Sequence, residues 1–217
     1  MALVVVAWLL GSAPGFAATN YQASQAGGVS SVFDRSGNQL TVSNRTDGNS
    51  AYIQITSYGR NQNVNWSRSH SDGYDERSTF VYVDASGGLI IVGARVVQGV
   101  RYLWAMKYTA NGDLAWERVD SASGCIAFDV MSNENGDIWA AGSCIDGGRY
   151  PIRVMRIDAN GNVRWGQSFD EGGRNYVRGL TVDFAERAAV TLEVSAGAGT
   201  YVRSVVFSPD GGRVATY

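Results

Sequence analysis

Residues 81–94 read VYVDASGGLIIVGA, and this stretch decides the fold because it recurs along the chain. It joins an apolar run, an aspartate, a glycine three residues later and a second apolar run. Related stretches surround Val32, Val130 and Val182. Their turn-forming acids or amides, 50, 49 and 50 residues apart, are Asp34, Asp84, Asn133 and Asp183. Such a period is the signature of a repeat architecture.

A second motif alternates with the first at the same period. It is a strand that ends in Thr, Asp or Ser, then two residues, a glycine and another strand. The copies are 56–59, 109–112, 158–161 and 208–211. A tryptophan follows three of them, at Trp66, Trp116 and Trp165, with three extra residues in the first copy. Short polar side chains that cap their own backbone, followed by glycine at positive φ, predict tight hairpin turns.

Each unit therefore predicts strand–turn–strand–loop–strand–turn–strand. A small sheet that is apolar on both faces must stack on its neighbours, and four-stranded sheets that repeat radially are the blades of a β-propeller. We expect an all-β propeller domain over residues 19–217. Its four blades are expected at about 29–68, 78–119, 126–169 and 179–217.

The unit resembles the bacterial SBBP-type β-propeller repeat, through V-x-V-D-x-x-G-x-L-x-V-x-G and the later K-Y-x-x-x-G-x-x-x-W. The stretch from Asp158 to Trp165 is also similar to the tryptophan-docking repeat of quinoprotein-like propellers. The resemblance covers about 28–217 and implies a fold rather than one activity. Adjacent cysteines and a calcium-ligand cluster are not found in the sequence, so we expect no cofactor.

Composition and the N-terminus bear on location and partners. A net charge of −2 and a pI of 5.4 give no electrostatic footprint for nucleic acid or anionic lipid. The apolar run at 2–10, the breakers Gly11 and Pro14, and the small residues Ala17 and Ala18 predict a signal peptide at 1–18. The mature chain is then expected to be secreted or periplasmic, with no membrane span; a buried N-terminal strand is the alternative.

The two cysteines are expected to form a disulfide. If the turn at 133–136 pairs Ser132 with Asp137, the same register places Cys125 opposite Cys144. In an oxidising compartment that geometry supports a bridge. Two free thiols are the alternative, and metal ligation is not expected in a chain with a single histidine.

No catalytic set is evident, so a non-enzymatic chain is favoured, although activity stays open. The recurring aspartates are interpreted as turn caps, since Ser, Thr or Asn replaces them in other copies. His70 is interpreted as a solvated loop residue, and Asp72, Asp75, Glu76 and the pair Asp170 and Glu171 as solvated acids. The repeated tryptophans are assigned to packing between blades. No metal site is expected.

Binding is expected where the second strand meets the third and where one blade meets the next. These connections appear longer and share one face of a propeller, where loops carry binding residues. The candidate ligand-binding residues are Tyr74, Asp75, Arg77, Arg95, Arg101, Arg149, Tyr150, Arg174 and Tyr176. An exported binding or scaffold module follows, with an unidentified protein or carbohydrate ligand.

Two alternatives stay open. One is a polysaccharide-acting lyase or hydrolase that uses Asp75, Glu76 and Glu171. The other is a fragment of a larger propeller. Residues 21–25 could complete the sheet of the last blade and close the ring, but the sequence does not decide ring closure, ligand or oligomeric state.

Overall fold

A computed structural model of the chain describes residues 21–24, 29–47, 50–197 and 199–217, and the leader expected at 1–18 lies outside them. Every regular element in the described residues is a β-strand. The strands are β1 (Tyr21–Ser24), β2 (Val29–Phe33), β3 (Gln39–Asp47), β4 (Ser50–Tyr58), β5 (Val64–His70), β6 (Asp75–Val83), β7 (Leu89–Val97), β8 (Val100–Tyr108), β9 (Leu114–Ser123), β10 (Cys125–Ser132), β11 (Ile138–Cys144), β12 (Ile152–Ile157), β13 (Val163–Phe169), β14 (Arg174–Val182), β15 (Ala188–Ala196), β16 (Gly199–Phe207) and β17 (Arg213–Thr216). In this part of the chain there is no helix long and apolar enough to cross a membrane.

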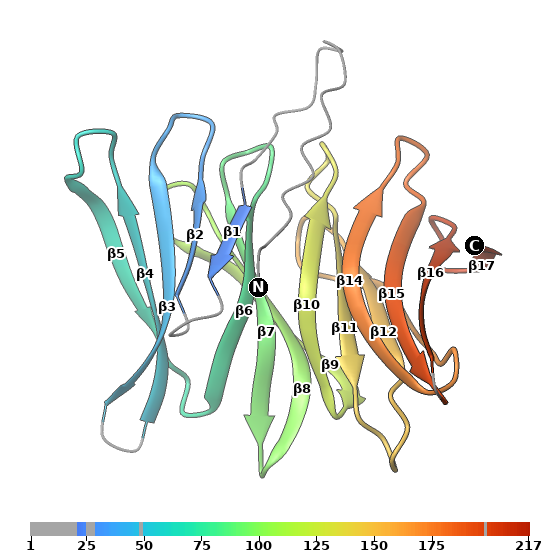
Figure 1. Ribbon diagram of the computed structural model, residues 1–217. Coiled ribbons are helices and arrows are strands. Elements are labelled where there is room, and N and C mark those ends of the chain that lie inside the picture. Colours follow the sequence, from blue (N-terminus) through green and yellow to red (C-terminus); the bar gives the residue numbers. More distant parts are fainter. Residues whose placement is uncertain (1–20, 25–28, 48–49, 198) are drawn as a thin grey trace.

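Consecutive strands pair into four antiparallel sheets, which confirms the all-β expectation. We call them module one (β1–β5), module two (β6–β9), module three (β10–β13) and module four (β14–β17). They lie side by side in chain order, with β5 and β17 at opposite ends (Figure 1). The first strand corrects one expectation. Residues 21–25 could have completed the last sheet, but the described part, β1, pairs with β2, with Tyr21 opposite Val32.

The first turn of each module is capped as expected. The Oδ1 atom of Asp84 accepts a hydrogen bond from the Gly88 amide at 2.8 Å. Asp183 does the same for the Arg187 amide at 2.9 Å. In module three Asn133 takes this role. The carboxylates thus stabilise the turns, as the exchange of Asp for Asn predicted.

The second turn of module one corrects the sequence reading. The Gly59 amide bonds to the Asn63 carbonyl at 2.8 Å, and Gln62, with φ 63°, takes the left-handed position. In the other modules that position holds Gly112, Gly161 or Gly211. Trp66 therefore follows Gln62 at the spacing by which Trp116 follows Gly112, and the expected insertion does not exist.

Apolar side chains fill the spaces between successive sheets. Strand β7 shows the pattern, since Leu89 and Ile91 face module one whereas Ile90 and Val92 face module three. A third cluster joins modules three and four. Among the described residues, no buried cluster joins module four to module one. The core is thus a series of layers between sheets.

A tryptophan from each of the first three modules reaches the second turn of the next. Its Nε1–H donates to a turn carbonyl at 2.8–3.1 Å, in the pairs Trp66–Ala110, Trp116–Ala159 and Trp165–Pro209. The ring lies on the turn glycine so closely that a β-carbon on Gly161 would lie 2.6 Å from Trp116 Cγ. Packing between modules, the role expected of these residues, is confirmed. We call this contact the tryptophan lock.

The disulfide Cys125–Cys144 is present, with the two Cα atoms 4.0 Å apart. The register argument behind its prediction was wrong in detail. Ser132 pairs with Ile138 rather than Asp137, because the turn is one residue longer than assumed. A β-bulge between Ala127 and Asp129 shifts the pairing back by one residue. The two offsets cancel, so the cysteines still oppose each other.

Candidate functional site

The connections between modules, and those between the second and third strands of modules two and three, lie on the edge drawn lowest in Figure 1. Most of them are shorter than expected. Modules two and three are joined by Gly124 alone, and β7 turns into β8 through residues 98–99. The long connection is 145–151 in module three. This edge is therefore mostly hairpin ends, with one extended loop.

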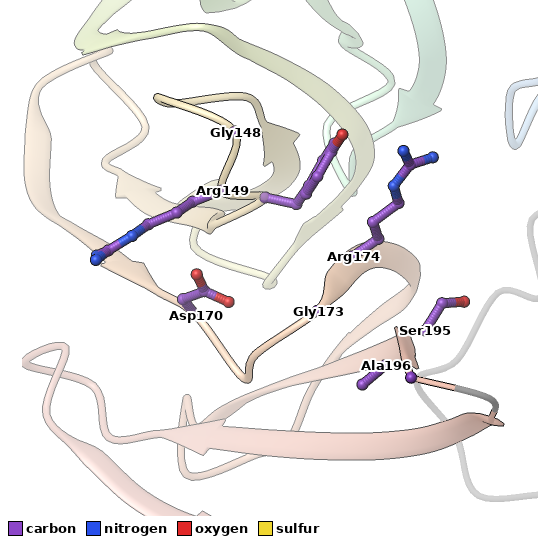
Figure 2. Close-up of a pocket in the computed structure, with 9 residues that line it drawn as sticks. Gly148, Arg149, Asp170, Gly173, Arg174, Ser195 and Ala196 are labelled. Carbon is purple, nitrogen blue, oxygen red and sulfur yellow. The ribbon is translucent and has the colours of Figure 1, made fainter.

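A pocket of about 740 Å³ opens on this edge between modules three and four. Its lining comes from the long connection, the link between the modules and the end of β15 (Figure 2). The lining residues are Gly148, Arg149, Tyr150, Asp170, Gly173, Arg174, Ser195, Ala196 and Gly197. Three of the candidate residues from the sequence thus share one pocket: Arg149, Tyr150 and Arg174.

The pocket is built by contacts across the two modules. Tyr150 forms a parallel bridge with Arg174, whose guanidinium carbon lies 5.0 Å from the centre of the Tyr150 ring. Asn175 is fully buried and donates to the Tyr150 carbonyl at 2.9 Å and to Asp170 Oδ1 at 2.7 Å. These bonds fix the backbone that presents the arginines. Cation–π contact holds the Arg174 side chain over a ring.

The two pocket arginines are exposed, and no carboxylate among the described residues forms an ion pair with either. In Figure 2 Arg149 and Arg174 extend in different directions. Asp170 is occupied by the Asn175 amide and the Gly172 backbone N–H. The pocket thus presents two guanidinium groups with free donors, which suit an anionic ligand.

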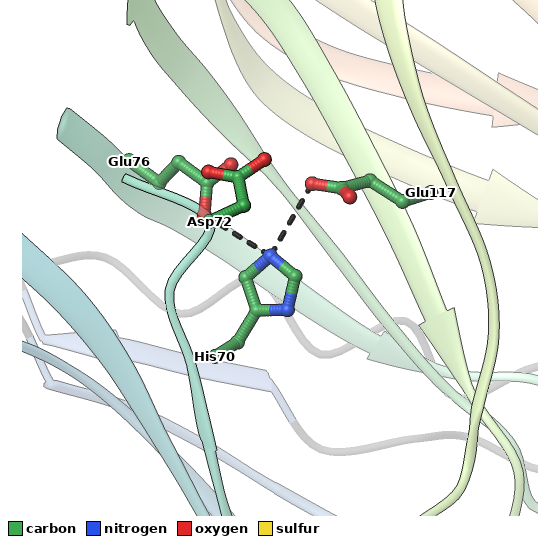
Figure 3. A group of neighbouring side chains, drawn as sticks. All are labelled: His70, Asp72, Glu76 and Glu117. Carbon is green, nitrogen blue, oxygen red and sulfur yellow. Dashed lines mark hydrogen bonds and ion pairs between the residues drawn. The ribbon is translucent and has the colours of Figure 1, made fainter. Parts of the chain in front are cut away.

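A second polar cluster lies between modules one and two. His70 ends β5, Glu76 lies in β6 and Glu117 lies in β9 (Figure 3). His70 Nε2 lies 3.1 Å from Glu76 Oε2 and 3.3 Å from Glu117 Oε1. Arg95 forms ion pairs with Glu76 and Glu117, and with Asp72 at 2.6 Å. Three carboxylates therefore contact Arg95, and two of them also contact His70.

This cluster corrects two expectations. The His70 side chain is only 10% exposed and that of Glu76 only 1%, so neither is a solvated loop residue. The pKa of His70 is raised to about 9, because it hydrogen-bonds to Glu117 and Glu76. The imidazole is therefore protonated at neutral pH. Burial raises the pKa of Glu117, but hydrogen bonds from His70 and Trp104 outweigh it and keep the pKa below its usual range.

The cluster has the donor types that could hold a metal ion. Single ligand atoms of His70, Asp72, Glu76 and Glu117 all lie within 4.8 Å of one another. However, an Arg95 nitrogen already contacts all three carboxylates, and protonated His70 contacts two. The positive charges that the acids need are thus supplied by side chains. The geometry fits a buried ion network that joins two modules.

The other candidate residues are dispersed. Asp75 and Arg77 pair with each other at 3.1 Å on the surface of β6. The exposed Tyr74 ring lies 5.1 Å from the Arg95 guanidinium carbon and so borders the ion network. Arg101 is exposed at the start of β8, and Tyr176 lies in β14. The nine candidate residues thus divide among the joint of modules one and two, the joint of modules three and four, and the surface.

Glu117 belongs to the ion network, but the sequence did not mark it as a candidate residue. It directly follows Trp116 in β9, where the repeat motif marks only the tryptophan. Its partner across the sheet is Met106, and His70 reaches it from the preceding module. The sequence showed only an acidic residue next to a tryptophan of the lock. It could not show the partners of that acid, because they come from strands far apart in sequence.

No protein-family model matches the chain, and no curated protein matches it. Among solved structures, an endo-arabinase from Bacteroides thetaiotaomicron VPI-5482 is similar at 12% identity with a TM-score of 0.41. The alignment covers 91% of this chain and 77% of the endo-arabinase. We infer neither fold nor function from a likeness at this level.

Proposed function

We propose that this chain is an exported, non-enzymatic binding module with a β-propeller-like stack of blades. It holds an acidic ligand, such as a carboxylated polysaccharide, in the pocket between modules three and four. The SBBP-like repeat and the disulfide support an exported, propeller-like protein. The pocket supports the binding role.

One observation carries the proposal. Arg149 and Arg174 both line the pocket without a carboxylate partner among the described residues, and Tyr150 lies beside them. Other arginines of this structure form ion pairs, which the two pocket arginines do not form with any described residue. Arg153, for example, lies 2.5 Å from Asp120. The volume of about 740 Å³ falls in the range of about 300–1,000 Å³ usual for ligand sites. Guanidinium groups recognise carboxylates through charge-assisted hydrogen bonds.

The test compares binding of an acidic and a neutral polysaccharide. Affinity electrophoresis in gels that contain polygalacturonate or linear arabinan reports retardation of the folded protein. We expect retardation by polygalacturonate, and its loss in the Arg149→Ala/Arg174→Ala variant. A matched variant, Arg164→Ala/Arg187→Ala, removes two exposed arginines elsewhere and should bind normally. Equal retardation of both variants, or none of the wild type, would contradict the proposal.

The enzyme alternative has one supporting observation, the convergence of Glu76 and Glu117 on His70. Carboxylates about 5–10 Å apart flank the scissile bond in glycosidases. The acids named for this alternative do not meet, since Asp75 pairs with Arg77, and Glu171 pairs with Arg203 and Arg213 in module four. Release of reducing sugar from arabinan or polygalacturonate, abolished by Glu117→Gln, would replace the binding proposal with this one.

A further inference from the structure

The tryptophan lock joins module one to two, two to three and three to four. The repeat allows the same contact to be sought at a fourth joint, from module four to module one. The two halves of that joint are a tryptophan in β17 and a glycine in the second turn of module one. Both positions can be identified from the strand register.

The donor half is missing from module four. The lock tryptophans lie opposite Ser57, Lys107 and Arg156 in their hairpins. The equivalent hairpin of module four places Ala215 opposite Val206. Alanine has neither the ring that covers a turn glycine nor the N–H that binds a turn carbonyl. Module four therefore has no lock to offer.

The receiving half is altered in module one. Gln62 takes the left-handed position that glycine holds in modules two to four. A β-carbon on the equivalent Gly112 would lie 2.6 Å from Trp66 Cδ2, so the Gln62 β-carbon excludes an indole in that pose. A pocket of about 540 Å³, bordered by Phe33, Tyr58 and Gln62, marks this turn on module one. Phe33 is 49% exposed.

The outer faces of the end modules are mixed, with hydrogen-bonded hydroxyl groups beside exposed apolar side chains such as Phe33 and Val202. In module one Val42 faces the core, and its neighbour Thr41 lies on the opposite face, next to Thr56. Thr56 Oγ1 hydrogen-bonds to Ser67 Oγ at 3.1 Å on that face. In module four Val190 faces the core, and Thr191 on the outer face hydrogen-bonds to Ser204 at 3.2 Å.

The middle modules differ, since β7 begins with four fully buried apolar residues and β11 with another four, Ile138 to Ala141. A strand buried on both faces is continuously apolar, whereas one buried on a single face alternates. The end strands alternate. Burial of their hydroxyls against a further sheet would remove the water that completes the hydrogen bonding of these groups.

We infer that modules one and four are caps that terminate the stack. The four sheets form an open arc, which does not close into a ring and does not add a second copy head to tail through the tryptophan lock. Two independent features agree at each end: an altered lock position and an outer face that carries hydroxyl pairs in place of a continuous apolar layer. Terminal repeats with polar outer faces keep repeat arrays soluble. This inference concerns assembly and stands whether or not the proposed ligand binds.

Electron–electron distance measurements between nitroxide labels test it. Labels on Val64→Cys and Val214→Cys, both exposed and in the outer strands of the end modules, span three joints. The matched pair Val64→Cys and Leu114→Cys spans one joint, and Leu114 is also exposed. The native disulfide leaves no other described cysteine to label. Circular dichroism of both variants checks that the sheets remain folded.

Packed sheets lie about 10 Å apart, so an open stack predicts that the 64–214 distance exceeds the 64–114 distance about two- to threefold. A closed four-module ring would make modules one and four neighbours, and the two distances would then be similar. Light scattering should give the monomer mass across a wide concentration range. Similar distances, or a mass that grows with concentration in wild type but not after Phe33→Ala/Gln62→Glu, would overturn the inference.

Discussion

His70 of module one and Glu117 of module two lie 3.3 Å apart, Nε2 to Oε1, so one ion pair crosses the first joint of the stack. Glu76, Asp72 and Arg95 surround the same contact. Module two could keep its carboxylates paired through Arg95 alone. The histidine therefore makes the strength of the first joint depend on pH in the alkaline range.

Stability should fall as the solution becomes alkaline, and His70 should be a cause. Its pKa is about 9 in the folded chain and 6.5 when free, so its contribution is complete below pH 6.5 and is lost as pH rises through 9. After allowance for solvent screening we expect a loss of about 1–2 kcal/mol. Urea unfolding of wild type and His70→Gln at pH 6.5 and 9.5 measures it. The same alkaline loss in both proteins would exclude His70 as the cause.

Gly161 should tolerate no side chain, because Trp116 covers it. Gly161→Ala places a β-carbon 2.6 Å from Trp116 Cγ, in a turn with φ 85°. The control is Gly99→Ala, since Gly99 has φ 80° and no neighbour within 4 Å. The first substitution should cost about 1–3 kcal/mol more than the second in the free energy of unfolding. Equal costs would mean that backbone strain, rather than the lock, requires glycine.

The Cys125–Cys144 bridge should stabilise module three. It closes a hairpin with a sequence separation of 19 residues. Its removal in Cys125→Ala/Cys144→Ala should cost about 2–4 kcal/mol. Urea unfolding of wild type with and without reductant should show a similar loss, and reductant should not affect the double variant. An unchanged midpoint in all cases would show that the sheet ladder alone sets the stability.

Lys107 should be required because it neutralises Asp84. The two charges are 2.6 Å apart, and the Asp84 side chain is only 1% exposed. Burial raises the pKa of Asp84, but the hydrogen bond and charge of Lys107, together with hydrogen bonds from Ser86 and the Gly88 amide, outweigh it and the pKa is lowered. Lys107→Met should cost about 3 kcal/mol, since it leaves a buried carboxylate unpaired. Adding Asp84→Asn should recover part of the loss, because Asn133 caps the matching turn in module three. No recovery would assign the loss to packing of the lysine stem.

The repeat made the sheets and turns predictable. Asp84 and Asp183 cap turns as the motif indicated, because a cap depends on residues four positions apart. The turn at Gln62 was misassigned because a glycine stood three residues earlier, and a non-glycine in the left-handed region carries no signal in sequence. The bulge beside Ala127 was equally hidden.

The candidate site was only partly predictable. Arg149, Tyr150 and Arg174 come together because two connections of neighbouring modules meet at one edge, which the repeat already implied. The surroundings of His70 could not be foreseen, since its partners Glu76 and Glu117 lie on two strands of the next module. The polar sequence around His70 predicted an exposed loop. Stacking of the first two sheets instead buries its side chain.

The alternation of Leu40 and Thr41, against the unbroken run from Leu89 to Val92, limits how such a protein can change in length. A duplicated end module would bring its hydroxyl-bearing face into the interior. A duplicated central module would instead pack against hydrophobic sheets on both of its faces. Loss of a terminal module would expose the hydrophobic face of its neighbour to solvent and favour aggregation. Growth in evolution, or in the laboratory, is thus expected from the middle outward.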